Sequence, residues 1–505
     1  MHSADTSANK SPYSAVDVPV DASLGASRPG LGLRVFKNTA ALLGGRVIGL
    51  ALSVVTSVLL ARFLGQERLG EYGAVYAYLS LYGFFATFCV EQILAREVTL
   101  RRGQAGSLFY TGTLATLAFS LIGSVLAPML APMFGYSGLI RWLIAIAAID
   151  TLVMAPIKLP GLIFQVDMRL WYSAVLGVFR QALWLVAVIL LAFRNAAFYE
   201  VIAARTVCGL IEAFLILWTI HRLRIIQGPR RFLAREAISL LRASAPLVLS
   251  TLAVSVYHRV DQVMLHKMAG DRVLGPYVIA VQLTELINTL PLALLSALFP
   301  ALSLSANDPQ QFQRYLRESY RLLMVFVFAV CAVMTPIAGP AVELFYSKKF
   351  ASTAPLLVVL IWSEIPVFFG VIMSSAMVAK GVQRWLPLST VLGAVANVTL
   401  NLVLIPRYGA LGASWATVIS YSLAGIFFLL LFSDTRPLAL PGLRISTPPL
   451  LVTLGLTIVL HFVSWPGWLK LTFAVVCYSV GAIATKSVLR SDLHRVWHMV
   501  RSQFA

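Results

Sequence analysis

The stretch that decides the fold runs from Tyr172 to Phe193 and reads YSAVLGVFRQALWLVAVILLAF. Arg180 is its only charged residue, and its length matches the roughly 20 residues that a helix needs to cross a bilayer. Similar runs recur along the whole chain of 505 residues, which is 59% hydrophobic and only 12% charged. Soluble domains carry roughly 25% charged residues, so this chain lacks the polar surface of a soluble protein. The composition therefore predicts a protein that crosses a membrane many times.

The apolar runs predict fourteen transmembrane helices. Backbone groups in lipid must hydrogen-bond within their own segment, and helices meet this requirement. The fourth helix contains Pro156 and Pro160, which interrupt its pattern. The expected class is an all-α polytopic membrane protein. Its helices are predicted at 38–61, 73–95, 108–131, 139–160, 172–193, 198–220, 243–266, 274–300, 320–343, 353–379, 385–405, 411–432, 446–464 and 467–486.

Basic residues fall mainly in alternate connections between these helices. Of the 40 Lys and Arg residues, 26 lie in or beside connections on the side of the N-terminus and 10 on the opposite side. The positive-inside rule then places both termini in the cytoplasm. Residues 1–35 are predicted to be a disordered cytoplasmic tail, and residues 487–505 a second cytoplasmic tail. Topology therefore explains the net charge of +19, and no nucleic-acid partner is expected.

A short internal repeat divides the chain into two halves. Residues 65–72 read GQERLGEY and residues 270–277 read GDRVLGPY, so Gly, Leu-Gly and Tyr recur at a constant offset of 205. Six helices separate the two copies, which gives the halves the same orientation, a known plan of transporters. The predicted units are then two six-helix halves at 36–220 and 243–432, a basic linker at 221–242, and two additional helices at 446–486.

The chain carries no pattern that is typical of an enzyme, a metal site or a cofactor site. HExxH, GxSxG and a Gly-rich phosphate loop before Lys and Ser or Thr are all missing. The cysteines lie within apolar runs without metal-ligand spacing and are predicted to fill the core. They are Cys89, Cys208, Cys331 and Cys477. We therefore expect no catalytic residue, no metal and no cofactor.

Four arginines remain within the predicted helices once those in or beside the connections are set aside. They are Arg46, Arg180, Arg205 and Arg259. A charge at mid-membrane costs about 2.5–3.5 kcal/mol on insertion scales, so it usually faces a cavity or a partner. One interpretation is a cationic cavity, which we favour for Arg46, Arg180 and Arg259. The alternatives are structural ion pairs, for example Arg205 with Glu212, or an Arg259 that extends to the interface.

Acidic side chains and one histidine also lie within the helices. The candidates for a polar passage or for ion coupling are Glu91, His258, Asp261, Glu285 and Glu364. His258 and Asp261 are three residues apart and can share a helix face, either as a protonatable pair or, as we favour, as a structural one. Two further polar faces can line a passage for sugars or can bond neighbouring helices. They consist of Tyr76, Ser80, Thr87 and Glu91, and of Gln282, Glu285 and Thr289.

Residues 397–413 read NVTLNLVLIPRYGALGA, which resembles the NxxxNxxLIPxxGxxGA pattern of the polysaccharide transporter family. These proteins are O-antigen and exopolysaccharide flippases of the multidrug/oligosaccharidyl-lipid/polysaccharide superfamily. The first-loop residues 62–72, Asp261 with Gly275-Pro276-Tyr277, and Ala379-Lys380-Gly381 are similar to other parts of the family. The resemblance covers about residues 35–490.

This resemblance implies a V-shaped bundle of two six-helix halves with two helices added. It implies a substrate that is a short oligosaccharide on undecaprenyl diphosphate, moved from the cytoplasmic to the periplasmic leaflet of the bacterial inner membrane. The arginines would meet the diphosphate, because a guanidinium can hold two phosphate oxygens. A polysaccharide polymerase and a chain-length regulator are possible partners.

Other functions compete with this one. A multidrug or cation exporter of the same superfamily would need an acidic site, whereas this chain places arginines within the membrane. A lipid II flippase is a second rival, although that family's usual sequence patterns do not follow the first two helices. A polysaccharide polymerase or ligase usually has a large periplasmic loop, and no predicted external loop exceeds about a dozen residues.

Overall fold

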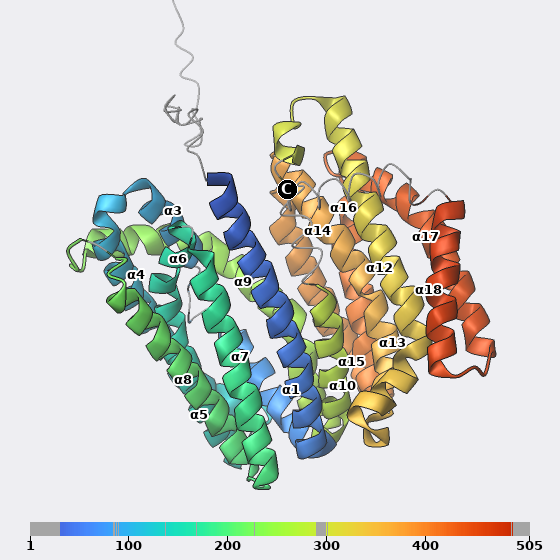
Figure 1. Ribbon diagram of the computed structural model, residues 1–505, viewed down its shortest axis with the longest axis horizontal. Helices are drawn as coiled ribbons and strands as arrows, with labels where there is room; N and C mark the ends of the chain where they lie inside the picture. The colour runs from blue at the N-terminus through green and yellow to red at the C-terminus, as the bar shows by residue number, and fades with distance from the viewer. Residues whose placement is uncertain are drawn as a thin grey trace, which may run out of the picture.

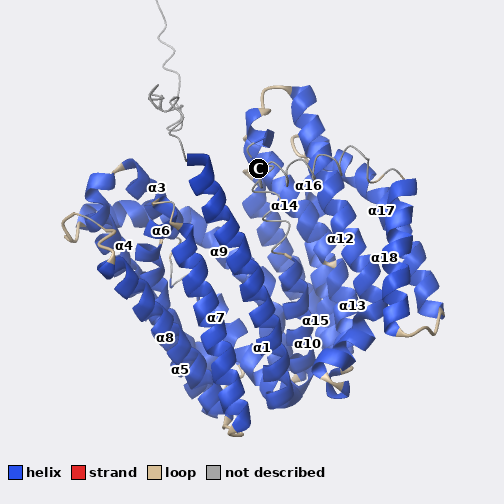
Figure 2. Cartoon of the chain, in the orientation of Figure 1, coloured by secondary structure: helices blue, strands red, loops and turns tan. Residues whose placement is uncertain are grey.

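The computed structural model shows a molecule built from long helices, with no strand among the residues it describes (Figure 1). Figure 2 shows only helices joined by short loops. Ten helices in the described part of the chain are long and apolar enough to cross a membrane. An all-α multi-pass membrane protein is thereby confirmed, while the number fourteen stays a prediction. The structure describes residues 31–83, 86, 88, 90–136, 138–167, 169–226, 228–288, 299, 301–485 and 487.

The first half of the chain forms a lobe that we call the first lobe. Its helices are α1 (Leu31–Leu81), α3 (Val90–Leu100), α4 (Ala105–Leu130), α5 (Gly138–Gly161), α6 (Ile163–Val166), α7 (Leu170–Phe193) and α8 (Phe198–Arg222). Single 3-10 turns at Arg102–Gln104 and Ala131–Phe134 flank α4. Hydrophobic runs make these helices, and their small residues let them pack closely.

The second lobe begins with a helix that crosses from one lobe to the other. The helices of this lobe are α9 (Ala234–Ala269), α10 (Asp271–Ile287), α12 (Pro309–Tyr346), α13 (Thr353–Trp362), α14 (Glu364–Ala379), α15 (Trp385–Ser422), α16 (Phe428–Leu430), α17 (Arg436–Phe462) and α18 (Gly467–Ala484). A 3-10 turn at Lys348–Phe350 precedes α13, and a π-helical turn at Leu423–Phe427 follows α15. Arg101 binds Glu236 in the first turn of α9 at 2.8 Å, which ties this helix to the first lobe.

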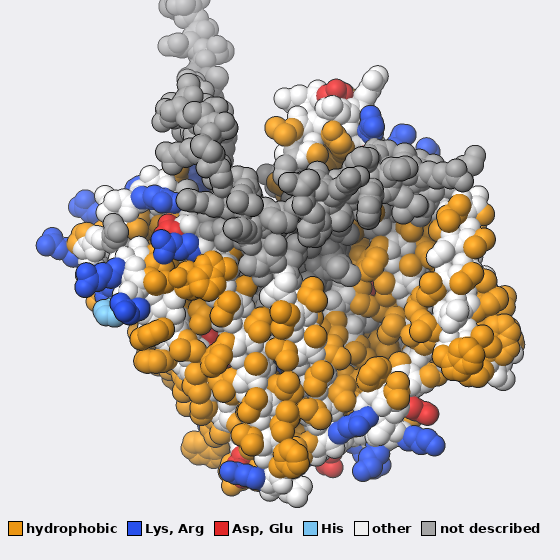
Figure 3. Space-filling model, in the orientation of Figure 1, with side chains coloured by type: hydrophobic (Ala, Val, Ile, Leu, Met, Phe, Trp, Pro, Cys, Tyr) orange, Lys and Arg blue, Asp and Glu red, His pale blue; other side chains and the backbone are white. Residues whose placement is uncertain are grey.

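The two lobes converge at one end and spread apart towards the other, as in a V (Figure 1). Helices α1 and α10 pack against each other where the lobes meet, and α9 packs against both α1 and α15. The wide end holds the start of α1, the α3–α4 connection and the linker between α8 and α9, and the narrow end holds the α9–α10 and α17–α18 connections. Figure 3 shows hydrophobic side chains over the middle of the bundle and Lys and Arg towards its ends, as a membrane protein requires.

The internal repeat has a structural counterpart at the narrow end. Gly65 and Gly270 have nearly the same backbone angles, with φ 72° and ψ −179° against φ 83° and ψ 167°. A methyl group on Gly70 would overlap the carbonyl of Asp271, and one on Gly275 would overlap the carbonyl of Gln66. Both pairs of residues are related by the offset of 205, so the two copies of the motif contact each other in a reciprocal manner. They therefore lie on the same side of the bundle, as the repeat predicts.

Two basic residues with the same offset connect the lobes at this end. Arg62 on α1 donates to the carbonyls of Leu344 and Phe345 at 2.8 and 2.7 Å, at the end of α12. Lys267 on α9 donates to the carbonyl of Met133 at 3.0 Å, just after α4. Cations suit the carbonyl ends of helices. We call Arg62 and Lys267, with these carbonyls, the narrow-end clasp.

Several helices differ from their predicted bounds. The second predicted helix, 73–95, is not one continuous element, because α1 ends at Leu81 and Phe88, just before α3 starts at Val90, has a left-handed φ of 43°. The tenth is divided between α13 and α14 at Ser363. The eleventh and twelfth share the label α15 but remain two helices that meet at the non-helical Gly409, whereas α5 continues through Pro156 and Pro160. Neighbouring helices can supply the backbone partners that an intramembrane proline removes.

Three helices start well before their predicted bounds. α9 starts at Ala234, which shortens the basic linker to residues 223–233, α12 starts at Pro309, and α17 starts at Arg436. Asp308 caps α12 by accepting from the backbone of Gln310 and Gln311 at 2.9 and 3.1 Å. These extensions are amphipathic, so hydropathy alone does not detect them. Most of the predicted tails, Cys89, Thr87 and Thr289 lie outside the described residues.

Candidate functional site

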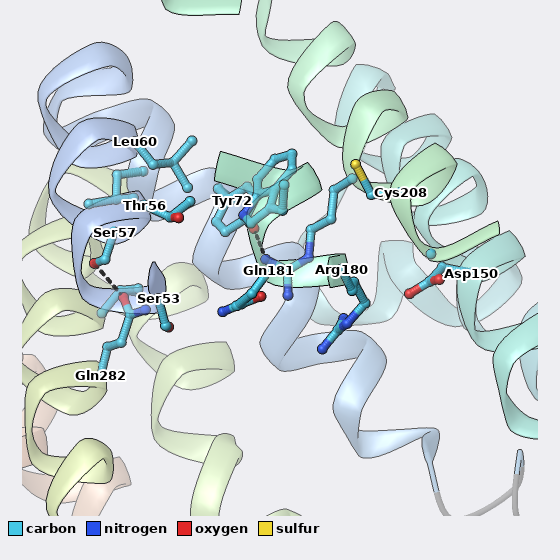
Figure 4. Close-up of a pocket in the computed structure, with 15 residues that line it drawn as sticks. Ser53, Thr56, Ser57, Leu60, Tyr72, Asp150, Arg180, Gln181, Cys208 and Gln282 are labelled. Carbon is cyan, nitrogen blue, oxygen red and sulfur yellow. Dashed lines mark hydrogen bonds between the residues drawn. The ribbon is translucent and has the colours of Figure 1, made fainter. Parts of the chain in front are cut away.

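A polar cavity lies where the two lobes meet (Figure 4). Its volume is about 160 Å³, and α1, α5, α7 and α8 of the first lobe and α10 of the second contribute to its wall. The polar and aromatic side chains of the wall include Ser53, Ser57, Tyr72, Asp150, Arg180, Gln181, Trp184, Arg205 and Gln282. A membrane-embedded cavity with this lining suits a ligand that is itself polar.

Arg205 on α8 is held by aromatic rings. Its Nη1 donates to the hydroxyl of Tyr72, and its guanidinium carbon lies 4.4 Å from the ring centre of Tyr76 and 5.7 Å from that of Trp184. Cation–π contacts stabilise a guanidinium without neutralising it. No carboxylate in the described part of the chain lies within ion-pair distance of Arg205. Its positive charge is therefore available to a ligand in the cavity.

Arg180 on α7 supplies a second cation to the same wall. Its Nε lies 3.1 Å from Glu212 on α8, and the Arg180 side chain is 44% exposed. The alternative pairing of Glu212 with Arg205 is wrong, because Glu212 forms its ion pair with Arg180. Asp150 also lines the cavity, and its buried Oδ1 makes no hydrogen bond to any residue that the structure describes. Gly209 gives this carboxylate room, since a methyl group there would overlap Oδ1.

Arg259 belongs to a separate acidic cluster in the second lobe. It pairs with Glu285 at 3.1 Å, and its side chain is 33% exposed. Asn288 Nδ2 donates to Oε1 of Glu364 at 3.4 Å, and the buried Oε2 of Glu364 has no hydrogen-bond partner among the described residues. A carboxylate that is buried with one amide donor and no cation is energetically costly in its charged form. Arg259 does not line the cavity, although the sequence grouped it with Arg180.

His258 and Asp261 do not form the pair that their spacing suggested. His258 Nδ1 contacts the hydroxyl of Tyr421 at 3.2 Å. Asp261 accepts from the hydroxyl of Tyr277 and, at 2.7 Å, from the backbone of Gln262. The two side chains do not pair because each has a hydrogen-bond partner on another helix, α15 for His258 and α10 for Asp261. The spacing of residues along α9 carries no information about these other helices.

Arg46 and Glu91 do not line the cavity either. Arg46 is exposed on α1 and precedes Gly65 by 19 residues, about 28 Å along a helix, which places it towards the wide end. Glu91 lies in the first turn of α3. Of the predicted cationic residues, the cavity therefore brings together Arg180 and Arg205.

Several cavity residues were not identified from the sequence as binding residues. Tyr72 was noted only as part of the repeat, and Ser53, Ser57, Gln181 and Trp184 carry no motif. Gln181 directly follows Arg180, and Ser53 and Ser57 are four apart on one helix face, which is the signal that could have identified them.

Residues 59–355 match the family described as polysaccharide biosynthesis protein. The chain belongs to this family. Membership confirms the resemblance to polysaccharide transporters that the motif at 397–413 indicated.

A related protein and two solved structures are similar to this family member. The "Probable low-salt glycan biosynthesis flippase Agl15" of Haloferax volcanii is 22% identical over 385 residues, which cover 74% of this chain and 79% of the relative. The "Lipid II flippase MurJ, inward closed conformation" gives a TM-score of 0.70 at 15% identity, over 90% of this chain and all of that one. A MATE family transporter of the MOP superfamily in an inward-facing conformation gives 0.62 at 16% identity, over 77% and 95% of the two chains. The last two show that the fold is shared.

Proposed function

We propose that the protein is a flippase for an oligosaccharide linked to undecaprenyl diphosphate. It moves this lipid from the cytoplasmic to the periplasmic leaflet of the bacterial inner membrane, with both chain termini in the cytoplasm. Family membership and the flippase relative support a lipid-linked glycan as the substrate. The excess of basic residues at the wide end supports the orientation.

The observation that carries this proposal is the pair Arg180 and Arg205 in one intramembrane cavity. A diphosphate that crosses the bilayer needs its charge screened at mid-membrane, and a guanidinium provides this without losing its proton. Arg205 is positioned by rings rather than by a carboxylate, so little must be broken before it binds phosphate oxygens. Arg180 can exchange Glu212 for the ligand.

The acidic cluster of the second lobe is our candidate for ion coupling. Glu285, Glu364 and Asp261 lie there with His258 and a single arginine, Arg259, among the residues named above. An acidic interior that binds a cation or proton complements a basic cavity that binds an anion. A polymerase or chain-length regulator remains the expected partner for the exported product.

A multidrug exporter is the principal alternative, since the MATE fold is shared. The cavity opposes it, because two arginines and one unpaired carboxylate favour an anion over a cationic drug. A lipid II flippase shares the fold and a lipid diphosphate, so it differs from our proposal only in the glycan. A polymerase or ligase receives no support from the relatives named above.

Export of polysaccharide from a strain that lacks the gene tests the proposal. Arg205→Ala should reduce export about tenfold or more, since charge-assisted hydrogen bonds contribute about 1.5–3 kcal/mol each. Arg205→Lys should restore it only in part, because the fork of the guanidinium is lost. Arg194→Ala is the control, because Arg194 forms an exposed pair with Glu200 at the narrow end. Normal export by both Arg205→Ala and Arg180→Ala at normal abundance would refute the proposal.

A further inference from the structure

The cavity has a neutral side as well as a cationic side. Ser53 and Ser57 on α1 and Gln282 on α10 lie together, across the cavity from Arg180 and Asp150, with Gln181 between the two groups (Figure 4). Among the described residues of this wall, Gln282 is the one polar side chain from the second lobe. The flippase proposal assigns the cationic side to the diphosphate and leaves the neutral side without a ligand.

The amide of Gln282 is held in one orientation. Ser57 Oγ donates to Gln282 Oε1 at 2.8 Å, and the hydroxyl of Tyr346 lies 3.3 Å from the same Ser57 oxygen. Ser57 and Tyr346 are 8% and 2% exposed, so this relay is buried. Because the relay occupies the amide oxygen, the Nε2 of Gln282 is left with two hydrogens that can be donated.

The other neutral groups have no partner of their own. Among the described residues, no hydrogen bond is made by the Ser53 hydroxyl, by the Gln181 amide or by Gln282 Nε2. The Ser53 hydroxyl and the Gln181 amide can each donate and accept, while Gln282 donates. Polar groups in a membrane interior that lack partners are costly unless a ligand or water satisfies them. The arrangement therefore matches a ligand with several adjacent hydroxyl groups.

We propose that Ser53, Gln181 and Gln282 bind the sugar that is joined directly to the diphosphate. This subsite rests on the proposed flippase function. In a glycosyl diphosphate the first sugar is bonded to a phosphate, so its hydroxyls lie within a few bonds of the charged oxygens. Gln181 follows Arg180 in the chain, which places an amide beside a cation in the way that such a ligand requires.

The subsite also couples the ligand to the position of the lobes. Gln282 reaches the cavity from α10, whereas Ser53 and Gln181 belong to α1 and α7 of the first lobe. A sugar that contacts all three residues interacts with this closed arrangement and loses a contact when the lobes separate. The neutral side thus selects glycosylated lipid over bare lipid in this conformation.

Binding to the purified full-length protein in detergent tests this assignment. The probes are undecaprenyl diphosphate and the same lipid with one glucose or one galactose, each titrated separately. The wild type should bind at least one glycosylated probe about fivefold to tenfold more tightly than the bare lipid, as expected for one or two hydrogen bonds. Gln282→Leu should bring this ratio close to one.

Gln181→Ala is a second variant, and it should fold like the wild type because the Gln181 side chain makes no hydrogen bond to a described residue. It should lower the same ratio. Gln311→Leu, at an exposed position in the first turn of α12, is the matched control and should bind like the wild type. Equal wild-type affinities for all probes, or a ratio that both variants preserve, would overturn the subsite. Failure of every probe to bind the wild type would instead count against the flippase proposal.

Discussion

At the scale of single residues, the charges in the bundle are distinguished by what holds them. Arg205 is positioned by aromatic rings, whereas Arg180 and Arg259 each have a carboxylate partner. In the family motif, the fully buried Asn397 donates to Ser420 Oγ at 3.1 Å, and the fully buried Asn401 donates to Asn397 Oδ1 at 2.9 Å. Residue type alone does not separate a ligand-binding group from a structural one, because both use the same side chains.

The pair Arg180–Glu212 allows these two roles to be tested separately. Arg180→Ala should destabilise the protein by about 1–2 kcal/mol, since it leaves Glu212 unpaired while the half-exposed arginine limits the loss. Arg180→Ala combined with Glu212→Gln should regain the wild-type melting temperature in detergent but not polysaccharide export. Arg194→Ala should change neither quantity. Wild-type export by the double variant would show that Arg180 serves only its partner.

At the scale of elements, glycines decide where the long helices bend and touch. The segments labelled α1 and α15 each contain two helices that meet at one glycine with positive φ, Gly65 or Gly409. After Gly65, α1 approaches α10 so closely that Gly70 and Gly275 face the partner backbone. Only a residue without Cβ allows this approach.

Replacement of either contact glycine should therefore separate α1 from α10. Gly70→Ala and Gly275→Ala should each cost about 1–3 kcal/mol, the range for steric overpacking, and their effects should be similar because the contacts are reciprocal. Thermal unfolding in detergent measures this. Gly339→Ala on α12 is the control, since no atom lies within 4 Å of the added methyl group. Wild-type melting temperatures for the two contact variants would contradict the close approach.

At the scale of the whole molecule, the lobes are joined at the narrow end and diverge at the wide end. The narrow-end clasp joins each lobe to the other through a cation and helix-end carbonyls. For the proposed transport to the opposite leaflet, we expect these contacts to break and the narrow end to open. The reciprocal arrangement means that both halves contribute to the same closure.

Loss of the clasp should open the cavity towards the narrow end. The proposed topology places the narrow end outside the cell. In a chain whose four native cysteines are replaced, Ser53→Cys should therefore report how fast a membrane-impermeant thiol reagent added outside reaches the cavity. Arg62→Ala with Lys267→Ala should speed labelling about threefold to tenfold, because it removes three hydrogen bonds that favour closure. Arg141→Ala should not, since Arg141 donates at 3.0 Å to Pro128 within the first lobe. An unchanged rate in the clasp variant would exclude this role.

The sequence by itself determined the class, the expected topology, the repeat and the family. Each of these depends on local properties, namely the length of apolar runs, the alternation of basic connections, and short motifs such as 65–72, 270–277 and 397–413. The helix starts at Ala234 and Pro309 were not predicted from the sequence, because amphipathic extensions have little net hydropathy.

Only the tertiary structure decided which charges share a cavity. Tyr72 and Arg205 are 133 residues apart, and Ser57 and Gln282 are 225 residues apart, yet each pair is in hydrogen-bond contact. Glu212 pairs with Arg180 rather than with Arg205 for the same reason, since α7 and α8 bring these side chains together. Partner choice within a membrane is set by how helices pack, and no local pattern records that packing.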